Sequence, residues 1–209
     1  MKGKERHFSA IGRRYAALCS HPEGMAGKLV LSLMDRLHRP FASWLLPRVP
    51  FSYPVLDIGS GSGYLSMRIL RRDRKAAVTL LDHSSASLEF SRHRLGRYGE
   101  RASFVCGSAE ALPFPPSSFS AAVMSDALYY VDMEKAFAEA WRILISGGFL
   151  VVAVEATDSG GAPSYLSGIA TIRGAEDIMK ALCRQGFRIV RSDAGRTAWA
   201  CIVAQKPMC

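Results

Sequence analysis

The sequence predicts an α/β fold in which helices cover both faces of a doubly wound, mostly parallel sheet. Short runs rich in Val, Leu, Ile and Phe alternate with helical segments along most of the chain. A glycine-rich turn follows the first run, and the last two runs are joined by a turn too short to hold a helix. Alternation of strand and helix is typical of a parallel sheet, whereas strands joined by a tight turn pair antiparallel. We therefore expect a parallel sheet that ends in an antiparallel hairpin.

The first 50 residues are predicted to form a helical cap ahead of the sheet. In its first part, apolar residues fall on one face of a helix, at Phe8, Ile11, Tyr15 and Leu18. After a break near residues 20–24, a second helix is indicated by apolar residues at every fourth position, namely Leu29, Leu33, Leu37, Phe41 and Leu45. Pro47 and Pro50 should end this helix, because proline lacks the N–H that a helix interior requires.

The remaining elements follow in a regular order. The predicted parallel strands are 53–58, 77–82, 102–106, 119–125 and 149–155. Helices are expected near 63–72, 84–98 and 132–145, with Gly147 and Gly148 stopping the last of them. A helix near 175–185 precedes two final strands, 187–192 and 197–205, around a turn at 193–196. The Pro-rich piece 112–116 is interpreted as a surface connection.

Composition favours a single domain spanning residues 1–209, with a cap over 1–50 and a core over 51–209. With 209 residues, 49% of them hydrophobic, the chain can bury a full core. No apolar run reaches the roughly 18 residues that a bilayer span needs, and the charged start lacks the apolar stretch of a secretory signal. The five cysteines form no C-x-x-C pair, which indicates reduced thiols in a cytoplasmic protein without a metal site. We expect Cys106, Cys183 and Cys201 to be buried.

The net charge of +9 comes from basic residues that cluster at the N-terminus and near the ends of the first two βα units. Such charge favours an anionic partner, which could be nucleic acid, an acidic membrane surface or an acidic small molecule. A solvated basic helix face explains the same pattern without any partner. Because no RNA-binding motif accompanies the charge, nucleic acid is the less favoured partner.

The most informative motif is the turn after the first strand, which reads D-x-G-x-G-x-G from Asp57 to Gly63. Glycines let the backbone turn tightly and approach a ligand, and the following helix points its free N–H groups the same way. A dinucleotide-binding turn would read G-x-G-x-x-G, but position 64 is Tyr. A nucleotide-binding turn and a plain tight connection remain alternatives. An acidic residue here suits a ligand that carries a positively charged amino group.

This motif resembles the first motif of the class I S-adenosylmethionine-dependent methyltransferases, which have a Rossmann-like sheet with an antiparallel C-terminal hairpin. The run from Gly107 to Phe114 is similar to the G-D-A-E-x-L-P-F run of the small-molecule enzymes grouped with ubiquinone/menaquinone biosynthesis. Ser108 stands where that family has the Asp that binds the adenine amino group. The runs 141–148 and 8–15 also resemble this family, and the latter implies an N-terminal lid over the cofactor.

The resemblance implies S-adenosylmethionine as the cofactor and S-adenosylhomocysteine as the product. Asp82 ends the second strand, where a carboxylate can accept hydrogen bonds from a ribose diol; capping of the next helix is the alternative. The expected cofactor-binding residues follow the strand ends and are Asp57, Gly59, Ser60, Gly61, Gly63, Asp82, His83, Ser108, Ala109, Glu110 and Ser125. No metal is implied.

The methyl acceptor is expected to be a small molecule. Tyr130, just past the fourth strand, and Tyr15, on the lid, are the candidate catalytic residues, although both could simply be pocket walls. No N-P-P-Y or D-P-P-Y run follows the fourth strand, which disfavours methylation of nucleic-acid amino groups. An RNA or protein methyltransferase and a non-catalytic cofactor-binding subunit are the alternative functions.

Overall fold

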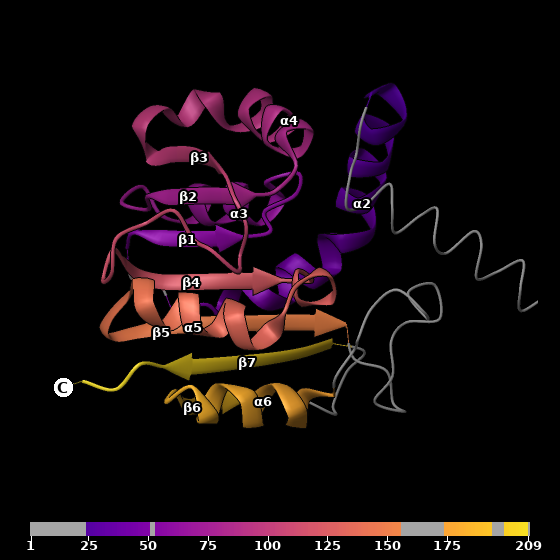
Figure 1. Ribbon diagram of the computed structural model, residues 1–209. Coiled ribbons are helices and arrows are strands. Elements are labelled where there is room, and N and C mark those ends of the chain that lie inside the picture. The colour runs from indigo at the N-terminus through magenta and orange to yellow at the C-terminus, as the bar shows by residue number, and fades with distance from the viewer. Residues whose placement is uncertain (1–23, 51–52, 156–173, 194–198, 209) are drawn as a thin grey trace, which may run out of the picture.

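The structure is a computed structural model that describes residues 24–50, 53–155, 174–193 and 199–208. Helices and strands alternate along most of this part of the chain (Figure 1). The elements are α2 (Gly24–Leu45), η1 (Leu46–Arg48), β1 (Val55–Ile58), α3 (Tyr64–Arg72), β2 (Val78–Asp82), α4 (Ser85–Leu95), η2 (Gly96–Arg101), β3 (Ala102–Cys106), β4 (Phe119–Ser125), η3 (Leu128–Tyr130), α5 (Met133–Ile143), β5 (Leu144–Glu155), α6 (Ala175–Arg184), β6 (Arg188–Ser192) and β7 (Trp199–Gln205).

One seven-stranded sheet runs through the protein in the order β3-β2-β1-β4-β5-β7-β6. The first five strands pair in parallel, and β7 pairs antiparallel with both β5 and β6. This confirms the predicted parallel sheet with an antiparallel C-terminal hairpin. The strand order reverses between β1 and β4, which is the point where open α/β sheets bind ligands.

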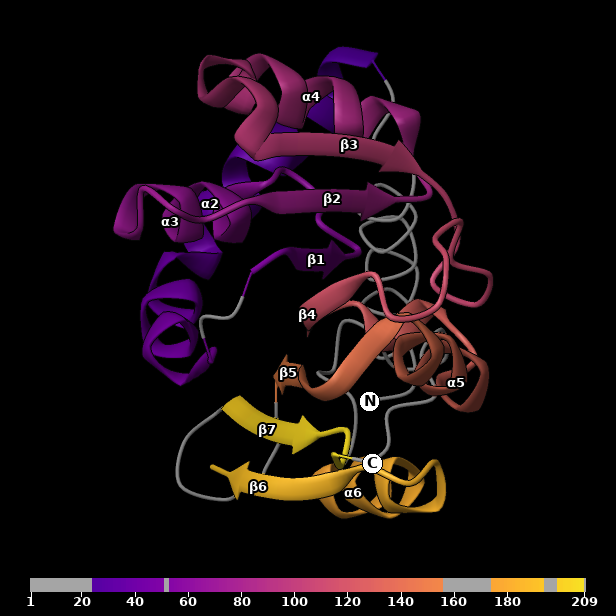
Figure 2. The same ribbon diagram turned by 90° about the vertical axis from the view of Figure 1, so that its left-hand side faces the viewer.

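Helices cover both faces of the sheet (Figure 2). On one face, the C-terminal half of α2 packs with α3 and α4 in an apolar cluster that includes Leu45, Ile69 and Leu88. On the other face, α5 and α6 pack in a second cluster, in which Phe137 is fully buried. Side chains of β1 contribute to both clusters, because successive residues of a strand point to opposite faces.

The N-terminal half of α2 differs from the expectation. Leu29 and Leu33 are 71% and 48% exposed, whereas Leu31, Phe41 and Leu45 are buried. A helix advances about 100° per residue, so a spacing of four residues drifts by about 40° at each step. From Leu29 to Leu45 this drift sums to about 160°, and the two ends of the leucine series therefore face nearly opposite directions. The predicted apolar stripe is not one continuous face.

The end of α5 is a second correction. The helix stops at Ile143, and β5 begins at Leu144, so Gly147 and Gly148 lie inside a strand rather than at a helix end. The ladder between β4 and β5 shifts register there, between Phe119 and Ala121. A basic side chain takes the place of a glycine cap: Lys206 Nζ donates to the carbonyl oxygens of Trp141 and Leu144, at 2.8 and 2.7 Å.

The cysteines are a third correction. Cys201 is buried on β7, but Cys106 and Cys183 are exposed. Cys106 is the last residue of β3, which forms one edge of the sheet, and Cys183 is the second-last residue of α6, so the expected burial is wrong for both.

Candidate functional site

The candidate site lies at the carboxyl ends of β1, β2 and β4, beside the reversal in strand order. The loop from Gly59 to Gly63, called here the glycine loop, leaves β1 and leads into α3. Parallel strands end at one edge of the sheet, so the loops after β2, β3 and β4 share this edge (Figure 1). The predicted site residues from these loops therefore gather at one edge.

The glycines of this loop differ in what a side chain at each position would contact. A Cβ on Gly63, whose φ is +71°, would come within 3.0 Å of Leu80 and Leu95 in the core, so this glycine permits close packing. A Cβ on Gly59 would lie 2.6 Å from the Ala127 Cβ. A Cβ on Gly61, whose φ is +51°, would meet no protein atom within 4 Å. Gly61 therefore faces the space where a ligand could approach the backbone.

Polar contacts hold this loop in place. The Gly61 N–H donates to Asp82 Oδ2 at 2.8 Å, and the Gly61 carbonyl accepts from Ser91 Oγ at 2.8 Å. Among the described residues, Ser60 Oγ is the buried side-chain polar atom without a hydrogen-bond partner. Buried polar atoms are nearly always paired, so this hydroxyl is a suitable contact for a polar ligand. The open space at Gly61 and this hydroxyl both fit a bound cofactor.

Asp82 connects the glycine loop with the start of α4. The residue is 6% exposed, and its Oδ1 accepts from the Ser84 N–H at 2.9 Å. The helix-capping alternative for Asp82 is wrong, because Ser84 is the N-cap of α4 and its Oγ accepts from the Ser87 N–H. The side chain of His83 is half exposed, with its Nδ1 3.6 Å from Asp82 Oδ1. Two accepted hydrogen bonds leave lone pairs on the carboxylate for a ligand hydroxyl.

Asp57 is buried beneath the glycine loop. Only 1% of the residue is exposed, and its Oδ2 accepts from Ser66 Oγ at 2.6 Å, which ties β1 to α3. Burial raises the pKa of this carboxyl from 3.8 to about 6, and the nearby Asp82 acts in the same direction. Contact between Asp57 and a ligand stays a prediction.

This pKa makes a testable prediction about stability. Between pH 3.8 and about 6, the folded state keeps a proton that the unfolded chain has lost, so the free energy of unfolding falls as the pH rises through this window. Asp57→Asn removes the titration. The variant should match the wild type near pH 4 and exceed it at pH 7 by up to about 3 kcal/mol. Urea unfolding at both pH values measures this difference, and an equal difference at both would contradict the assignment.

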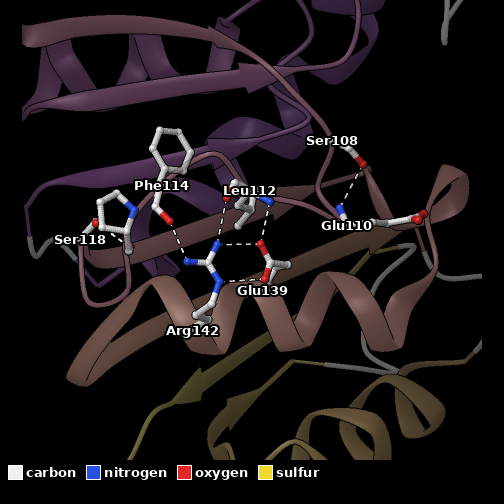
Figure 3. Close-up of polar contacts among 8 residues, drawn as sticks. Ser108, Glu110, Leu112, Phe114, Ser118, Glu139 and Arg142 are labelled. Carbon is white, nitrogen blue, oxygen red and sulfur yellow. Dashed lines mark hydrogen bonds and ion pairs between the residues drawn. The ribbon is translucent and has the colours of Figure 1, made fainter.

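The loop after β3 carries three predicted cofactor-binding residues, of which Figure 3 shows Ser108 and Glu110. Ser108 Oγ accepts from the Glu110 N–H at 3.1 Å, Ala109 is buried, and Glu110 Oε1 accepts from the Asp132 N–H at 2.7 Å. The loop is thereby tied to the start of α5. A Cβ on Gly107 would lie 3.3 Å from atoms of Leu81 and Pro113, so the loop passes close to the end of β2.

A pair on α5 that the sequence analysis missed holds the rest of this loop. Arg142 donates to the carbonyl oxygens of Phe114 and Leu112, at 2.7 and 2.9 Å, and Glu139 accepts from the Leu112 N–H at 2.7 Å (Figure 3). Glu139 and Arg142 also form an ion pair at 2.7 Å. The 112–116 piece is therefore more than a surface connection: Leu112 is buried, and the Phe114 ring packs against Phe119 at 5.0 Å.

Arg142→Met should lower the free energy of unfolding by about 2 kcal/mol, because two carbonyl oxygens and a carboxylate lose a charged donor. Arg184→Met is the matched control. Arg184 also pairs with a glutamate, but that ion pair is 60% and 47% exposed and should contribute less than about 1 kcal/mol. Urea unfolding of both variants tests the difference, and equal losses would show that the carbonyl contacts of Arg142 add nothing.

The loop after β4 carries Ser125 and the candidate catalytic Tyr130. Ser125 is half-buried at the strand end, and Tyr130 lies in η3 with 40% of its surface exposed. Tyr130 packs edge-on against Tyr129, whose hydroxyl donates to Asp126 Oδ1 at 3.3 Å. Tyr15, the second candidate, lies outside the described residues. Within the described ranges, no group of His, Cys, Asp and Glu side chains could hold a metal ion.

Comparison with known proteins points in the same direction as this geometry. The methyltransferase domain family matches residues 56–152. The ubiquinone/menaquinone biosynthesis C-methyltransferase of Methylobacterium nodulans is 37% identical over 148 residues, which are 68% of this chain and 54% of that protein. A rice chloroplast 2-methyl-6-phytyl-1,4-hydroquinone methyltransferase is 36% identical over 95 residues, covering 45% of this chain and 27% of that protein. The chain spans about half the length of the first of these relatives.

Solved structures share the fold. Geranyl diphosphate C-methyltransferase from Streptomyces coelicolor superposes with a TM-score of 0.68 at 17% identity, covering 91% of this chain and 87% of that one. The cyclase SpnF superposes with a TM-score of 0.69 at 22% identity, covering 84% and 81%. At these identities the likeness concerns the fold alone. The sheet order, the glycine loop, the matching family and the curated relatives together support a class I S-adenosylmethionine-dependent methyltransferase.

Proposed function

We propose that this protein transfers a methyl group from S-adenosylmethionine to a small-molecule acceptor and releases S-adenosylhomocysteine. The observation that carries the proposal is the pairing of the glycine loop with a buried carboxylate at the reversal in strand order, through the Gly61 N–H and Asp82 Oδ2. The open space at Gly61 and the unpaired Ser60 Oγ support it.

The cofactor site is proposed to use the loops after β1 to β4. Asp82 accepts hydrogen bonds from the ribose hydroxyls, and Ser108 with the Ala109 backbone contacts the adenine. Asp57 supplies negative charge beneath the amino acid end of the cofactor. The remaining proposed contacts are Gly59, Ser60, Gly61, Gly63, His83, Glu110 and Ser125.

The bound cofactor would supply a methyl group already activated on a sulfonium. The protein's own task is then to align the acceptor and exclude water, which can contribute roughly 7 kcal/mol or more. We propose Tyr130, in η3 just past β4, and Tyr15 as the residues beside the reacting atoms. Their aromatic faces suit a cation, and a tyrosine that has lost its own proton can accept one from the acceptor through the phenolate oxygen.

For the acceptor, the name of the rice relative favours a hydroquinone, and the name of the Methylobacterium nodulans relative, a C-methyltransferase, favours methylation of carbon. Methylation of a ring carbon forms a C–C bond to the methyl group, and the ring carbon then loses its proton to a base. The same names favour a small molecule over RNA or protein, and a methyltransferase over a non-catalytic subunit. A cytoplasmic location and a single domain over 1–209 are further parts of the proposal, and an acidic small molecule is the alternative acceptor. In the part of the chain that the structure describes, no helix has the length and apolar character to cross a bilayer.

Part of the basic charge that suggested an anionic partner serves the fold. Arg101 donates to the carbonyl oxygens of Ala76, Leu70 and Asp73, at 2.6 to 3.0 Å. Arg92 donates to the Phe104 carbonyl. These contacts support the interpretation of the basic helices as structural surfaces rather than a nucleic-acid site.

The test has two parts. Calorimetry should show binding of S-adenosylmethionine and S-adenosylhomocysteine, and the melting temperature should rise with either ligand because both select the folded state. Incubation with S-adenosylmethionine and a prenylated 1,4-hydroquinone should then give S-adenosylhomocysteine and a product heavier by one CH₂ in mass spectrometry. Absence of binding would overturn the proposal, whereas binding without turnover of any acceptor in a cell extract would support the non-catalytic alternative.

A further inference from the structure

A buried polar network joins the N-terminal helix to the glycine loop. Asp35, on α2, is 8% exposed. One of its carboxylate oxygens accepts from Ser62 Oγ in the glycine loop, and the other accepts from the Arg94 guanidinium on α4. Arg94 also donates to the Ser62 carbonyl at 3.0 Å and contacts Ser62 Oγ at 3.3 Å, so three elements meet at Ser62.

The position of Ser62 gives this network its importance. Ser62 lies between Gly61 and Gly63, and both glycines have a positive φ. Glycine has no side chain to pack, and it loses more conformational freedom on ordering than any other residue. The conformation of such a loop must therefore be held by polar contacts. Asp82 and Ser91 hold Gly61 from the core of the sheet domain, and Asp35 holds the next residue from the cap.

The charges make the network sensitive to the loss of one member. The side chains of Asp35 and Arg94 are 10% and 20% exposed, so their pairing is largely shielded from water. Removing one partner of such a pair leaves the other charge poorly compensated. Without the Asp35 carboxylate, Arg94 would be free to turn toward solvent, and Ser62 would lose the contacts of both side chains.

We propose that Asp35 and Arg94 are positioning residues that set the glycine loop for binding of S-adenosylmethionine. The α2 helix then packs on the sheet and also supplies, through Asp35, a side chain that positions the cofactor-binding loop. Any change that displaces α2, such as entry of an acceptor beside the cap, would alter affinity for the cofactor through Asp35. This inference rests on the proposed function, because it assigns a consequence for cofactor binding to the loop geometry.

The test is Asp35→Asn, which keeps the size of the side chain and removes its charge. Affinity for S-adenosylhomocysteine should fall about tenfold, which is about 1.4 kcal/mol. KM for S-adenosylmethionine should rise by a similar factor, while kcat stays within about twofold. When the enzyme is saturated, the bound cofactor holds the loop in place by its own contacts. If Asp35 had only a structural role, the variant would lose stability without a selective rise in KM for S-adenosylmethionine.

Asp193→Asn is the matched control. Asp193 pairs with Arg48, directly after α2, at 2.6 Å, and the two side chains are 25% and 21% exposed. This ion pair ties the same N-terminal segment to β6, far from the glycine loop in the sheet order. The control variant should lose stability but keep wild-type affinity for S-adenosylhomocysteine. Equal affinity losses in both variants would overturn the proposal.

Ser62→Ala provides a second variant that leaves the Asp35–Arg94 pair intact. If the network acts as a unit, the double variant Asp35→Asn, Ser62→Ala should bind S-adenosylhomocysteine no more than about twofold weaker than Asp35→Asn alone. If the affinity losses of the two single variants instead multiplied in the double variant, the two residues would act independently, and the network would not act as a unit.

If the wild-type protein binds no S-adenosylhomocysteine, the proposed function fails. Hydrogen exchange of the Gly61, Ser62 and Gly63 amides then tests whether Asp35 holds the glycine loop. Faster exchange in Asp35→Asn than in Asp193→Asn supports the positioning role, and equal exchange overturns it.

Discussion

Gly61→Val should reduce affinity for S-adenosylmethionine roughly a thousandfold or more, which is about 4 kcal/mol. In the structure, a Cβ at this position would project into space that holds no protein atom within 4 Å. The added side chain therefore meets a ligand rather than the protein. A branched side chain is also strained at a φ of +51°. Any shift that relieves this strain would move the Gly61 N–H away from Asp82, with which it forms a 2.8 Å hydrogen bond.

Gly99→Val separates strain from ligand contact. Gly99 in η2 has a φ of +57°, and a Cβ there also meets nothing within 4 Å. Both variants should lose free energy of unfolding, and the loss at Gly99 should be the larger, because its ψ of −134° lies outside the left-handed helical region; only Gly61→Val should lose cofactor binding. Calorimetry with S-adenosylhomocysteine and urea unfolding give the two quantities. If Gly61→Val bound the ligand as tightly as Gly99→Val, the glycine loop would not be the cofactor site.

The central strands could be predicted from the sequence because each is a compact apolar run between turn residues. β3 and β4 have the bounds that were predicted, and β1 and β2 begin one or two residues later than expected. In the buried strands β1, β2 and β4, local composition and tertiary burial agree, since both sides of each strand face a helical layer. The glycine loop was recognisable for a related reason, because glycine is required where the backbone must turn and pack closely.

The errors lie where distant residues decide the outcome. Lys206 caps α5 from positions 62 and 65 residues away, and no local signal marks that contact. Arg142 binds carbonyl oxygens 28 and 30 residues away. Arg94 and Asp35 lie 59 residues apart, and no local pattern marks their pairing, although the fold brings them together. Composition indicates charge, but only the packing of α2 against α4 shows which charges are paired.

In the site, too, local sequence identified a residue but did not show its contacts with distant parts of the chain. Asp82 was predicted as a ligand residue because a carboxylate at the end of the second strand faces the switch point. The sequence could not show that both of its oxygens already accept backbone N–H groups, from Gly61 and Ser84. This changes what its removal should do. A carboxylate that contacted only a ligand could be deleted at little cost to folding, whereas this one also orders two loops.

Asp82→Ala should therefore weaken cofactor binding and the fold together. The buried Ser84 N–H and the partly buried Gly61 N–H would lose their acceptor, which we expect to lower the free energy of unfolding by about 2 kcal/mol. Affinity for S-adenosylhomocysteine should fall by a further 2–3 kcal/mol, the scale of lost charge-assisted hydrogen bonds to the ribose. Urea unfolding and calorimetry measure the two losses separately. A loss of stability with unchanged affinity would make Asp82 a purely structural residue.

A second ligand makes the ribose assignment sharper. The 2′-deoxyribose analogue of S-adenosylhomocysteine lacks one of the hydroxyls that Asp82 is proposed to bind. The wild type should bind this analogue about tenfold more weakly than S-adenosylhomocysteine, because a carboxylate lone pair loses its donor. Asp82→Ala should bind the two ligands with nearly equal affinity, since the contact is already gone. Loop disorder weakens both ligands alike, so it cannot imitate this pattern. If the variant still discriminated tenfold between the ligands, another residue would hold the ribose, and Asp82 would act only by ordering the glycine loop through the Gly61 N–H.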